Sequence, residues 1–371
     1  MACPTPKIPT GDPLSEFTEA GLSLSPTFID FAVRWLSGTG FSAQCWANQL
    51  SEQRGNERVL MDDAAEYRLQ RLLLDEQGQA LIDRVYDWFT RLATGRTEAL
   101  EELHTRCHFI AVVGIPRTGG SYLTSEIFRA LAYEPQQVPA AIAHDGFPDA
   151  RPFSMFGHNN SWIDCLLSIG EYLVLLELFF AGGCGGTRTV VPKKATKAVY
   201  AGGLFKHVFG ADAEYLITVR HPLACCISTY DKSGGLPPDG RFKVRSAIER
   251  WIRRDLCLTG ISAEELAGMD YFEAYARYWE QFHIALALSG LVAHRNYRVI
   301  PYGSESMEAT ARRFHEHYGS ARPITRFLSS AGQHKRHPQW VARSKEAIAR
   351  VDSVWHLLGL EFPKDALLSC T

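Results

Sequence analysis

The sequence predicts an α/β protein in which helices cover a central parallel β-sheet in three layers, preceded by an N-terminal helical lobe. Residues 1–104 show the apolar spacing of helices, whereas residues 105–371 alternate short β-rich runs with helical patterns. Strands that alternate with helices form parallel sheets with both faces covered. At 371 residues the chain also exceeds the usual size of one core, which favours a lobe and a separate domain.

The N-terminal lobe carries apolar residues at helical spacing. Aromatic residues at such positions are usually core, so we assign no chemistry to residues 1–104. The residues concerned are Phe28, Phe31, Ala32, Trp35 and Leu36, then Leu69, Leu72 and Leu73, then Leu81, Ile82, Val85, Trp88 and Phe89.

Four apolar runs in the second domain predict buried parallel strands. Helical patterns follow these runs, and the helix after the first run begins at a glycine loop. Residues 231–246 lack periodicity and are rich in Gly and Pro, and long loops of this kind are often lids. The predicted strands are residues 108–113, 189–191, 215–219 and 297–302.

Charge and composition exclude several classes of protein. The chain has 39 Lys and Arg against 41 Asp and Glu, a net charge of −2, and 46% apolar residues. A disordered chain would need fewer apolar residues or a larger net charge. A domain that binds nucleic acid through bulk charge would need a positive field. We therefore expect a folded protein that does not bind nucleic acid.

Targeting and metal-binding patterns are absent from the sequence. No apolar run reaches 18 residues, and Met1–Leu14 lacks the apolar core of a signal peptide. The nine Cys contain no CxxC pair, and the 13 His form no HExxH motif. We expect a cytoplasmic protein with reduced thiols, no transmembrane segment and no bound metal.

The glycine loop at Gly114–Ser121 has the GxxxxGx[ST] spacing of a P-loop. Backbone N–H groups of such a loop, with the N-terminus of the helix that follows, bind phosphate. The lysine that reaches the β- and γ-phosphates in nucleotide triphosphatases is replaced by Gly120, and Arg117 is the cation within the loop. The loop therefore suits a phosphate that carries a transferable group better than a metal-bound triphosphate.

The run Ile115-Pro116-Arg117-Thr118-Gly119-Gly120-Ser121-Tyr122-Leu123 resembles the 5′-phosphosulfate loop of sulfotransferases, in the arginine form typical of tyrosylprotein sulfotransferases and many bacterial members. A second run, Val219-Arg220-His221-Pro222-Leu223 with Ser228 further on, is similar to the 3′-phosphate motif of that family. The resemblance covers roughly residues 108–320 and implies a three-layer P-loop fold for residues 105–371.

The resemblance implies 3′-phosphoadenosine 5′-phosphosulfate (PAPS) as donor, 3′,5′-adenosine bisphosphate (PAP) as product, and no metal. From the residues alone, Arg220 follows a strand, where α/β sheets place ligands, and its guanidinium suits a phosphate. A late basic turn with Lys335 and Arg336, followed by Trp340, is expected to close the nucleotide site. The loop and motif residues assigned to the nucleotide are Arg117, Thr118, Gly119, Gly120, Ser121, Tyr122, Arg220 and Ser228.

Two cations match the family's catalytic groups. Arg117 matches the one that stabilises charge on the leaving phosphate. Lys194 is the best match to a lysine that contacts the sulfate, with Lys193 and Lys197 as alternatives. Thr196 stands where cytosolic members have a histidine base, so we expect the base to come from elsewhere.

The candidate general base lies in residues 141–148, the region from which the arginine branch often takes it. His144 titrates near neutral pH, and Asp145 can accept a proton directly or orient the histidine. His158 and His207 are further candidates.

The function predicted from these residues is transfer of a sulfuryl group from PAPS to a hydroxyl or amine of a small-molecule acceptor. Two alternatives stay open: a P-loop kinase or nucleotide hydrolase, which Gly120 argues against, and a non-catalytic PAP-binding protein, which Arg117 argues against. A homodimer is also open. Aromatic residues indicate a lipidic or aromatic acceptor: Phe147, Phe153, Phe156, Trp162, Phe179 and Phe180.

Overall fold

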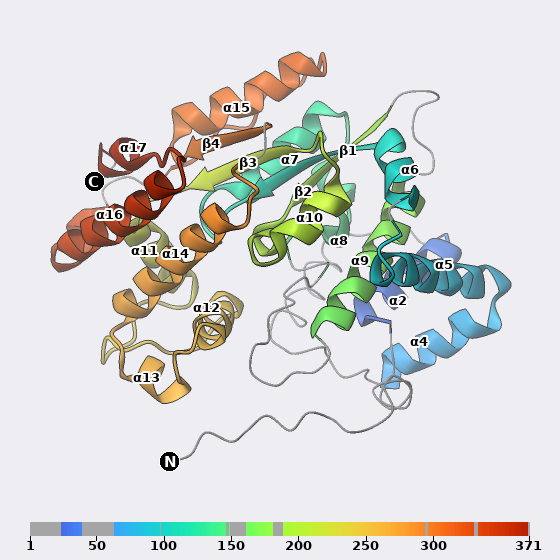
Figure 1. Ribbon diagram of the computed structural model, residues 1–371, viewed down its shortest axis with the longest axis horizontal. Coiled ribbons are helices and arrows are strands. Elements are labelled where there is room, and N and C mark those ends of the chain that lie inside the picture. The colour runs from blue at the N-terminus through green and yellow to red at the C-terminus, as the bar shows by residue number, and fades with distance from the viewer. Residues whose placement is uncertain are drawn as a thin grey trace. The chain divides into compact units, whose positions relative to one another are not determined.

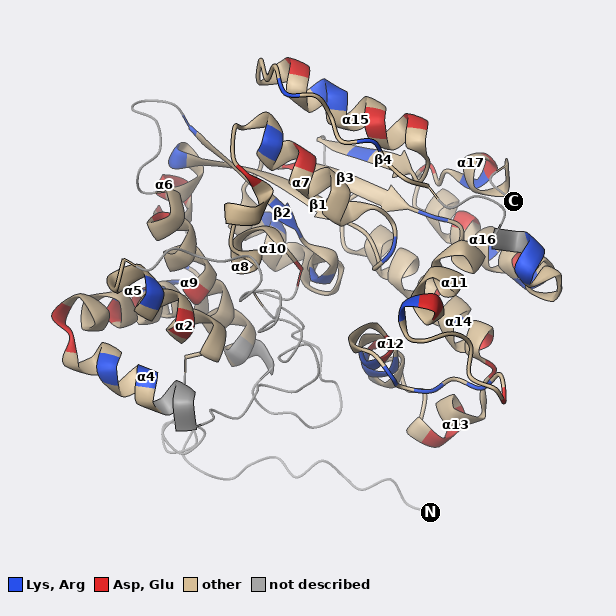
Figure 2. Ribbon diagram, turned by 180° about the vertical axis from the view of Figure 1, so that it is seen from behind, with Lys and Arg blue, Asp and Glu red and all other residues tan. Residues whose placement is uncertain are grey.

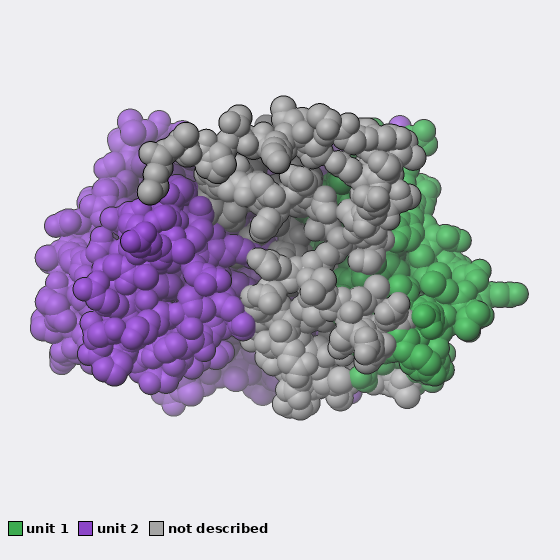
Figure 3. Space-filling view, turned by 90° about the horizontal axis from the view of Figure 1, so that it is seen from below, with its two compact units in different colours: residues 1–40, 56–96, 148–181 green, residues 41–55, 97–147, 182–371 purple. Residues whose placement is uncertain are grey.

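The computed structural model describes residues 24–38, 63–96, 98–145, 148, 161–180, 188–293, 296–329 and 333–369 (Figure 1). The chain divides into two compact units, coloured separately in Figure 3. Unit 1 comprises residues 1–40, 56–96 and 148–181, and unit 2 comprises residues 41–55, 97–147 and 182–371. These units group residues by contact, so the domain boundary expected at residue 104 stays a prediction.

A four-stranded parallel sheet forms the centre of unit 2, counting the described residues, in the order β2-β1-β3-β4. The prediction of an α/β protein with a central parallel sheet is thereby confirmed. The strands are β1 (Cys107–Val113), β2 (Thr189–Lys194), β3 (Glu214–Val219) and β4 (Tyr297–Pro301).

Strand β2 runs three residues beyond its predicted end at residue 191. The sequence favoured a turn at these three residues because they are a proline and two lysines. β2 lies at an edge of the sheet, where Pro192 is tolerated because one side of the strand needs no ladder hydrogen bond. The pairing of Val112 with Lys194 then brings Lys194 level with the end of β1.

Helices pack on the sheet through alternate residues of β1. Ile110 and Val112 join a buried cluster with Leu123 of α7 (Gly120–Ala130) and Met307 of α15 (Ser304–His317). The intervening Phe109 packs its ring 5.0 Å from that of Phe209 in α10 (Gly202–Phe209). Successive side chains of a strand point to opposite faces, so these contacts place helices against both faces of β1.

Unit 2 has further helices besides those packed on β1. Helices α15 and α16 (Val341–Leu357) carry charges of both signs (Figure 2). The loop predicted at 231–246 begins after residue 232, because helix α11 (Pro222–Lys232) continues to Lys232. Phe242 anchors this loop by donating its backbone N–H to the carbonyl of Met269. The remaining elements are α6 (Glu98–Arg106), η1 (Pro135–Gln137), α8 (Ala140–Ala143), η2 (Thr196–Ala201), α11 (Pro222–Lys232), α12 (Ala247–Leu258), α13 (Ala263–Gly268), α14 (Tyr271–Leu288), η3 (Gln333–Arg336), η4 (Pro338–Trp340), α16 (Val341–Leu357) and α17 (Lys364–Ser369).

The described part of unit 1 is helical, as the spacing predicts for its N-terminal share. Gly170 lets two of its helices approach closely, since a Cβ there would lie 2.9 Å from the carbonyl oxygen of Val85. Buried Glu171 accepts hydrogen bonds from the backbone N–H and hydroxyl of Ser25. The described helices of unit 1 are α2 (Pro26–Leu36), α4 (Asp63–Leu74), α5 (Glu76–Ala93) and α9 (Ser161–Phe180).

Candidate functional site

The glycine loop between β1 and α7 is shaped by close contacts that exclude side chains. A Cβ on Gly114 would lie 2.1 Å from Thr218 Oγ1, and one on Gly119 would lie 2.8 Å from Met307 Cε. Gly119 also caps α7 with a φ of 90°, which disfavours other residues. These glycines are therefore required by the fold of the loop itself.

Thr118 stabilises the loop from within. Its side chain is fully buried, and its hydroxyl donates to the carbonyl of Ile115 at 2.8 Å and lies 2.8 Å from the Thr218 hydroxyl. Thr118 is one of the residues predicted to bind the nucleotide, and the structure turns its hydroxyl toward the loop and β3.

Arg117 is held in an unusual backbone conformation at the tip of the loop. Its φ is 77°, a left-handed value that costs a non-glycine residue about 1–3 kcal/mol unless its surroundings enforce it. Arg220 donates to the Arg117 carbonyl at 3.0 Å, and Arg117 Nε donates to Ser228 Oγ at 2.9 Å. Residues from the ends of β1 and β3 are thereby brought together.

A cavity of about 500 Å³ lies at the carboxyl ends of the strands. The connection leaving β1 leads to β2 on one side, and the connection leaving β3 leads to β4 on the other. Ligands of α/β sheets bind where connections diverge in this way. Described residues that line the cavity are Arg117, Gly119, Gly120, Ser121, Lys194, Arg220, Ser228, Asp231, Lys232, Tyr302, Phe327 and Leu328.

Arg220 is fixed on three sides although it faces the cavity. Its side chain is 4% exposed, and the guanidinium carbon lies 3.9 Å from the centre of the Tyr302 ring. Its backbone carbonyl accepts a hydrogen bond from Trp279 Nε1 at 3.0 Å. A planar cation stacked on an aromatic ring in this way is preorganised to bind an oxyanion in its plane.

Lys194 lies beside the loop position that lacks a lysine. A Cβ on Gly120 would lie 3.3 Å from Lys194 Cε, so the two residues are in contact. Successive residues of β2 point to opposite faces, and accordingly Lys194 lines the cavity while the neighbouring Lys193 bonds elsewhere. Strand β2 therefore supplies a cation that the loop sequence does not.

Asp145 is the carboxylate next to Lys194. It is 3% exposed, and its Oδ2 lies 4.0 Å from Lys194 Nζ. Within the described residues this oxygen accepts no hydrogen bond. A buried carboxylate with a nearby cation and an unused acceptor atom can receive a proton.

His144, the other candidate base, is not among the described residues that line the large cavity. Its Nε2 lies 3.2 Å from Ser121 Oγ, and its Nδ1 lies 3.0 Å from the carbonyl oxygen of Asp145. It lines a second hollow of about 50 Å³, which shares Ser121 with the cavity. Of the other candidates, His207 lies on α10, and His158 falls outside the described residues.

An irregular strap at residues 320–329 forms a wall of the cavity that the sequence analysis missed. Phe327 and Leu328 line the cavity, and Tyr122 supports them with its ring 4.8 Å from that of Phe327. Burial raises the pKa of Tyr122 to about 12, so its phenol stays protonated and donates to the Thr325 carbonyl at 2.8 Å. Tyr122 thus supports the wall from behind.

An ion pair joins the late basic turn to a residue of the cavity lining. Arg336 donates two hydrogen bonds, of 2.6 and 2.9 Å, to Asp231, which lines the cavity. Lys335 and Arg336 are both exposed and are not among the described residues that line it. Trp340 is buried against the ring of Phe272, with their centres 5.0 Å apart.

Among the described residues, seven predicted ones therefore line the cavity: Arg117, Gly119, Gly120, Ser121, Lys194, Arg220 and Ser228. Tyr302 was not predicted as a site residue, although it follows β4, and the rule that ligands lie at strand ends would have found it. The strap residues carry no local signal, because their place depends on hydrogen bonds to α15, the preceding helix, and to α7, which is distant in the chain. Of the aromatic residues predicted to contact the acceptor, Phe147, Phe153 and Phe156 lie outside the described residues. The segment Met1–Leu14, which lacks a signal-peptide core, also lies outside them.

No protein-family model matches the chain, and comparisons with curated proteins and with solved structures find no match either. Within the described residues, no group of three or more His, Cys, Asp or Glu side chains is close enough to hold a metal ion. No helix in the described part of the chain combines the length and the apolarity that a membrane span requires. The functional assignment therefore depends on the residues of the cavity.

Proposed function

We propose that the protein is a sulfotransferase that moves a sulfuryl group from PAPS to a hydroxyl or amine of a small molecule. The observation that carries this proposal is the convergence of Arg117, Lys194, Arg220 and Ser228 on one cavity, from the ends of three neighbouring strands. The cavity volume of about 500 Å³ lies in the range that small-molecule sites occupy.

Two groups of residues would bind the two ends of the nucleotide. Helix α7 begins at Gly120, so the first backbone N–H groups of α7 have no partner within the helix and suit the 5′-phosphate. Arg220 and Ser228 suit the 3′-phosphate, because a fixed guanidinium and a hydroxyl supply donors to its oxygens. The loop would then act as a P-loop in a three-layer fold, which the helices against both faces of β1 support.

The proposed transfer replaces the S–O bond to the donor phosphate with an S–O or S–N bond to the acceptor. The acceptor oxygen or nitrogen forms a bond to sulfur as the bond from sulfur to the 5′-phosphate oxygen breaks, and the acceptor gives up one proton. Arg117 and Lys194 would stabilise the negative charge that grows on the leaving phosphate. The products are the sulfated acceptor, PAP and a proton.

Asp145 fits the role of proton acceptor better than His144 does. The carboxylate lies 4.0 Å from Lys194, which lines the cavity, whereas the imidazole lines the smaller hollow. Asp145 Oδ2 is buried and accepts no hydrogen bond from the described residues, so no other donor uses its lone pairs.

Nucleotide binding tests the proposal directly. We expect PAP to raise the melting temperature of the wild type, and Arg220→Ala to remove most of this shift. Arg343→Ala, an arginine of α16 whose described partners are Asp270 and Glu273, is the matched control and should keep the shift. No shift with millimolar PAP, or an equal shift with ATP and magnesium, would contradict the proposal and favour a kinase or hydrolase.

Turnover separates an enzyme from a binding protein. With PAPS and a panel of phenolic, lipidic and amine acceptors, we expect a mass gain of one sulfuryl group on at least one acceptor, and loss of this product in Arg117→Ala. Stable PAP binding without any transfer across the panel would favour the non-catalytic PAP-binding protein.

A further inference from the structure

The segment that carries Asp145 has little structure of its own to hold it in place. Its helix, α8, has only four residues, Ala140–Ala143, which is too short to be stable alone. The backbone N–H of His144 donates to the Ala140 carbonyl, and the carbonyls at the end of the helix need donors from another element. The position of Asp145 therefore depends on what binds these carbonyls.

Lys193 supplies those donors from β2. Its side chain is 2% exposed, and its Nζ donates to the carbonyl of Ala141 at 2.9 Å and to the carbonyl of His144 at 2.9 Å. The backbone of Lys193 is itself fixed, because it pairs with Ala111 in the centre of the sheet. One side chain thereby ties both ends of the turn before Asp145 to the sheet.

The charges around Lys193 are consistent with this role. Burial, together with the nearby Lys197, lowers the pKa of Lys193 to about 7, while Asp145 opposes the shift. Lys194 is the third buried lysine at this end of β2. An amine carries two N–H groups even without its proton, so Lys193 can donate both hydrogen bonds in either protonation state.

We propose that Lys193 is a positioning residue that holds the 139–145 segment on β2 and so keeps the Asp145 carboxylate beside Lys194, which lines the cavity. This inference rests on the proposed function, because Asp145 is the proton acceptor there. In this assignment Lys193 acts on the reaction through Asp145 and binds neither substrate. Its loss should therefore slow turnover without weakening nucleotide binding.

Lys193→Met tests the proposal, because methionine keeps the length and apolar stem of lysine but removes the donors. We expect kcat to fall at least tenfold, with KM for PAPS and the affinity for PAP within twofold of wild type. Lys206→Met on α10 makes the same chemical change away from the segment and should leave both unchanged. Wild-type kcat in Lys193→Met would overturn the proposal.

A double-mutant cycle separates positioning from a general structural role. Lys193→Met should cost less than twofold in kcat when Asp145→Asn is already present, since the residue acts through Asp145. Losses that multiply would contradict the proposal. If Lys193→Met does not fold, Lys193→Gln replaces it in the same cycle. Glutamine keeps an N–H donor, but its side chain is one atom shorter than that of lysine. Losses of kcat that multiply in this second cycle would equally contradict the proposal.

Hydrogen exchange gives a readout that needs no activity. Peptides covering residues 139–145 should exchange at least tenfold faster in Lys193→Met than in wild type, while peptides from β1 and β3 are unchanged. Unchanged exchange in 139–145 would also overturn the proposal. If wild type shows neither PAP binding nor turnover, the proposed function fails, and this exchange result still reports on the contact between Lys193 and the segment.

Discussion

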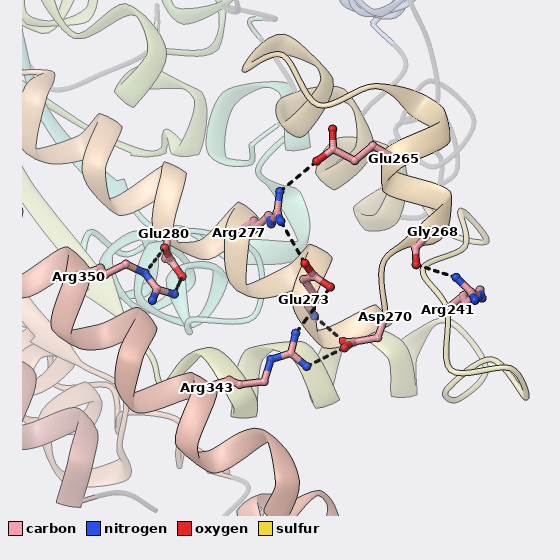
Figure 4. A network of polar contacts seen from close by, with 9 residues as sticks. All are labelled: Arg241, Glu265, Gly268, Asp270, Glu273, Arg277, Glu280, Arg343 and Arg350. Carbon is pink, nitrogen blue, oxygen red and sulfur yellow. Dashed lines mark hydrogen bonds and ion pairs between the residues drawn. The ribbon is translucent and has the colours of Figure 1, made fainter.

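Two regions of unit 2 are rich in charge, and they use it in opposite ways. The surface around α13, α14 and α16 carries four arginines and four carboxylates (Figure 4). Three of the arginines, Arg277, Arg343 and Arg350, pair with the carboxylates, and the fourth, Arg241, donates to the Gly268 carbonyl. The cavity is lined by four cations, Arg117, Lys194, Arg220 and Lys232, against the single carboxylate of Asp231 among the described lining residues. The surface charges therefore balance, whereas those of the cavity leave an excess of positive charge for a ligand.

The two regions also differ in burial. In the surface network, Arg350 pairs with Glu280 at 2.7 Å with its side chain 57% exposed, so solvent screens the interaction. In the cavity, Lys194 and Arg220 are less than a tenth exposed, and a charge held there interacts more strongly with its neighbours. Excess charge that is also buried is costly to keep, which makes it a better sign of a binding site than the number of charged residues.

The largest expected effect is on turnover. Arg117→Ala should lower kcat by about 10²–10³, the usual cost of removing one group that stabilises developing charge. PAP should still raise the melting temperature, because Arg220 and the loop backbone remain. Steady-state kinetics with PAPS checks this, and Arg343→Ala in the surface network is the control. A loss below tenfold would remove the distinction between cavity and surface cations.

The next effect concerns the buried pair of Lys194 and Asp145. Lys194→Met should destabilise the protein by about 3 kcal/mol at pH 7, because it leaves the Asp145 carboxylate buried without its cation. Urea denaturation measures this, and adding Asp145→Asn to Lys194→Met should restore most of the loss. If the single variant loses less than 1 kcal/mol, the buried pair behaves like a surface pair.

A smaller effect appears in the pH dependence of stability. The pKa of Lys193 in the folded protein is about 7, below its usual value of 10.5. Between these values the unfolded chain holds a proton that the folded chain has released, so this group raises stability with pH by at most about 1.4 kcal/mol per unit. Below pH 7 both states are protonated and the contribution is constant.

Comparing wild type with Lys193→Met isolates that contribution. We expect the difference in unfolding free energy, wild type minus variant, to be flat from pH 5 to about 7 and to rise toward pH 10. Denaturant titrations at each pH measure it. A difference that falls with rising pH would mean that the folded protein keeps Lys193 protonated.

The smallest effect belongs to the surface network. Arg350→Ala removes the pair with Glu280 and should cost no more than about 1 kcal/mol, falling further in high salt. Denaturation at low and high ionic strength checks both statements. A loss as large as that of Lys194→Met would show that burial does not separate the two regions.

The sequence predicted the sheet well because its strands are local apolar runs. β3 was expected at 215–219 and spans Glu214–Val219, while β2 was cut short because lysines at a strand end resemble a solvated turn. Unit 1 groups α9 with helices from residues 1–104, and the sequence did not indicate this because contacts between distant segments leave no local pattern.

The candidate site was predictable where it follows strand ends. Arg117, Lys194 and Arg220 each lie within a few residues of a strand terminus, which the sequence reveals. The strap residue Phe327 was not predictable, because a glutamate of α15, Glu308, holds it by accepting its backbone N–H at 2.9 Å. The role of Lys193 depends on two backbone carbonyls, which no side-chain motif can encode.

Because successive side chains of β2 point to opposite faces of the sheet, the position of each lysine along the strand decides which face it occupies. Deleting or inserting one residue within the strand would exchange their sides, so that Lys193 would face the cavity and Lys194 the backbone of the 139–145 segment. Both lysines would still be present, and composition and charge would be almost unchanged, yet Gly120 and Asp145 would face the wrong partners. We therefore expect the site to be far more sensitive to an insertion or deletion in β2 than the Pro-Lys-Lys sequence of this strand indicates.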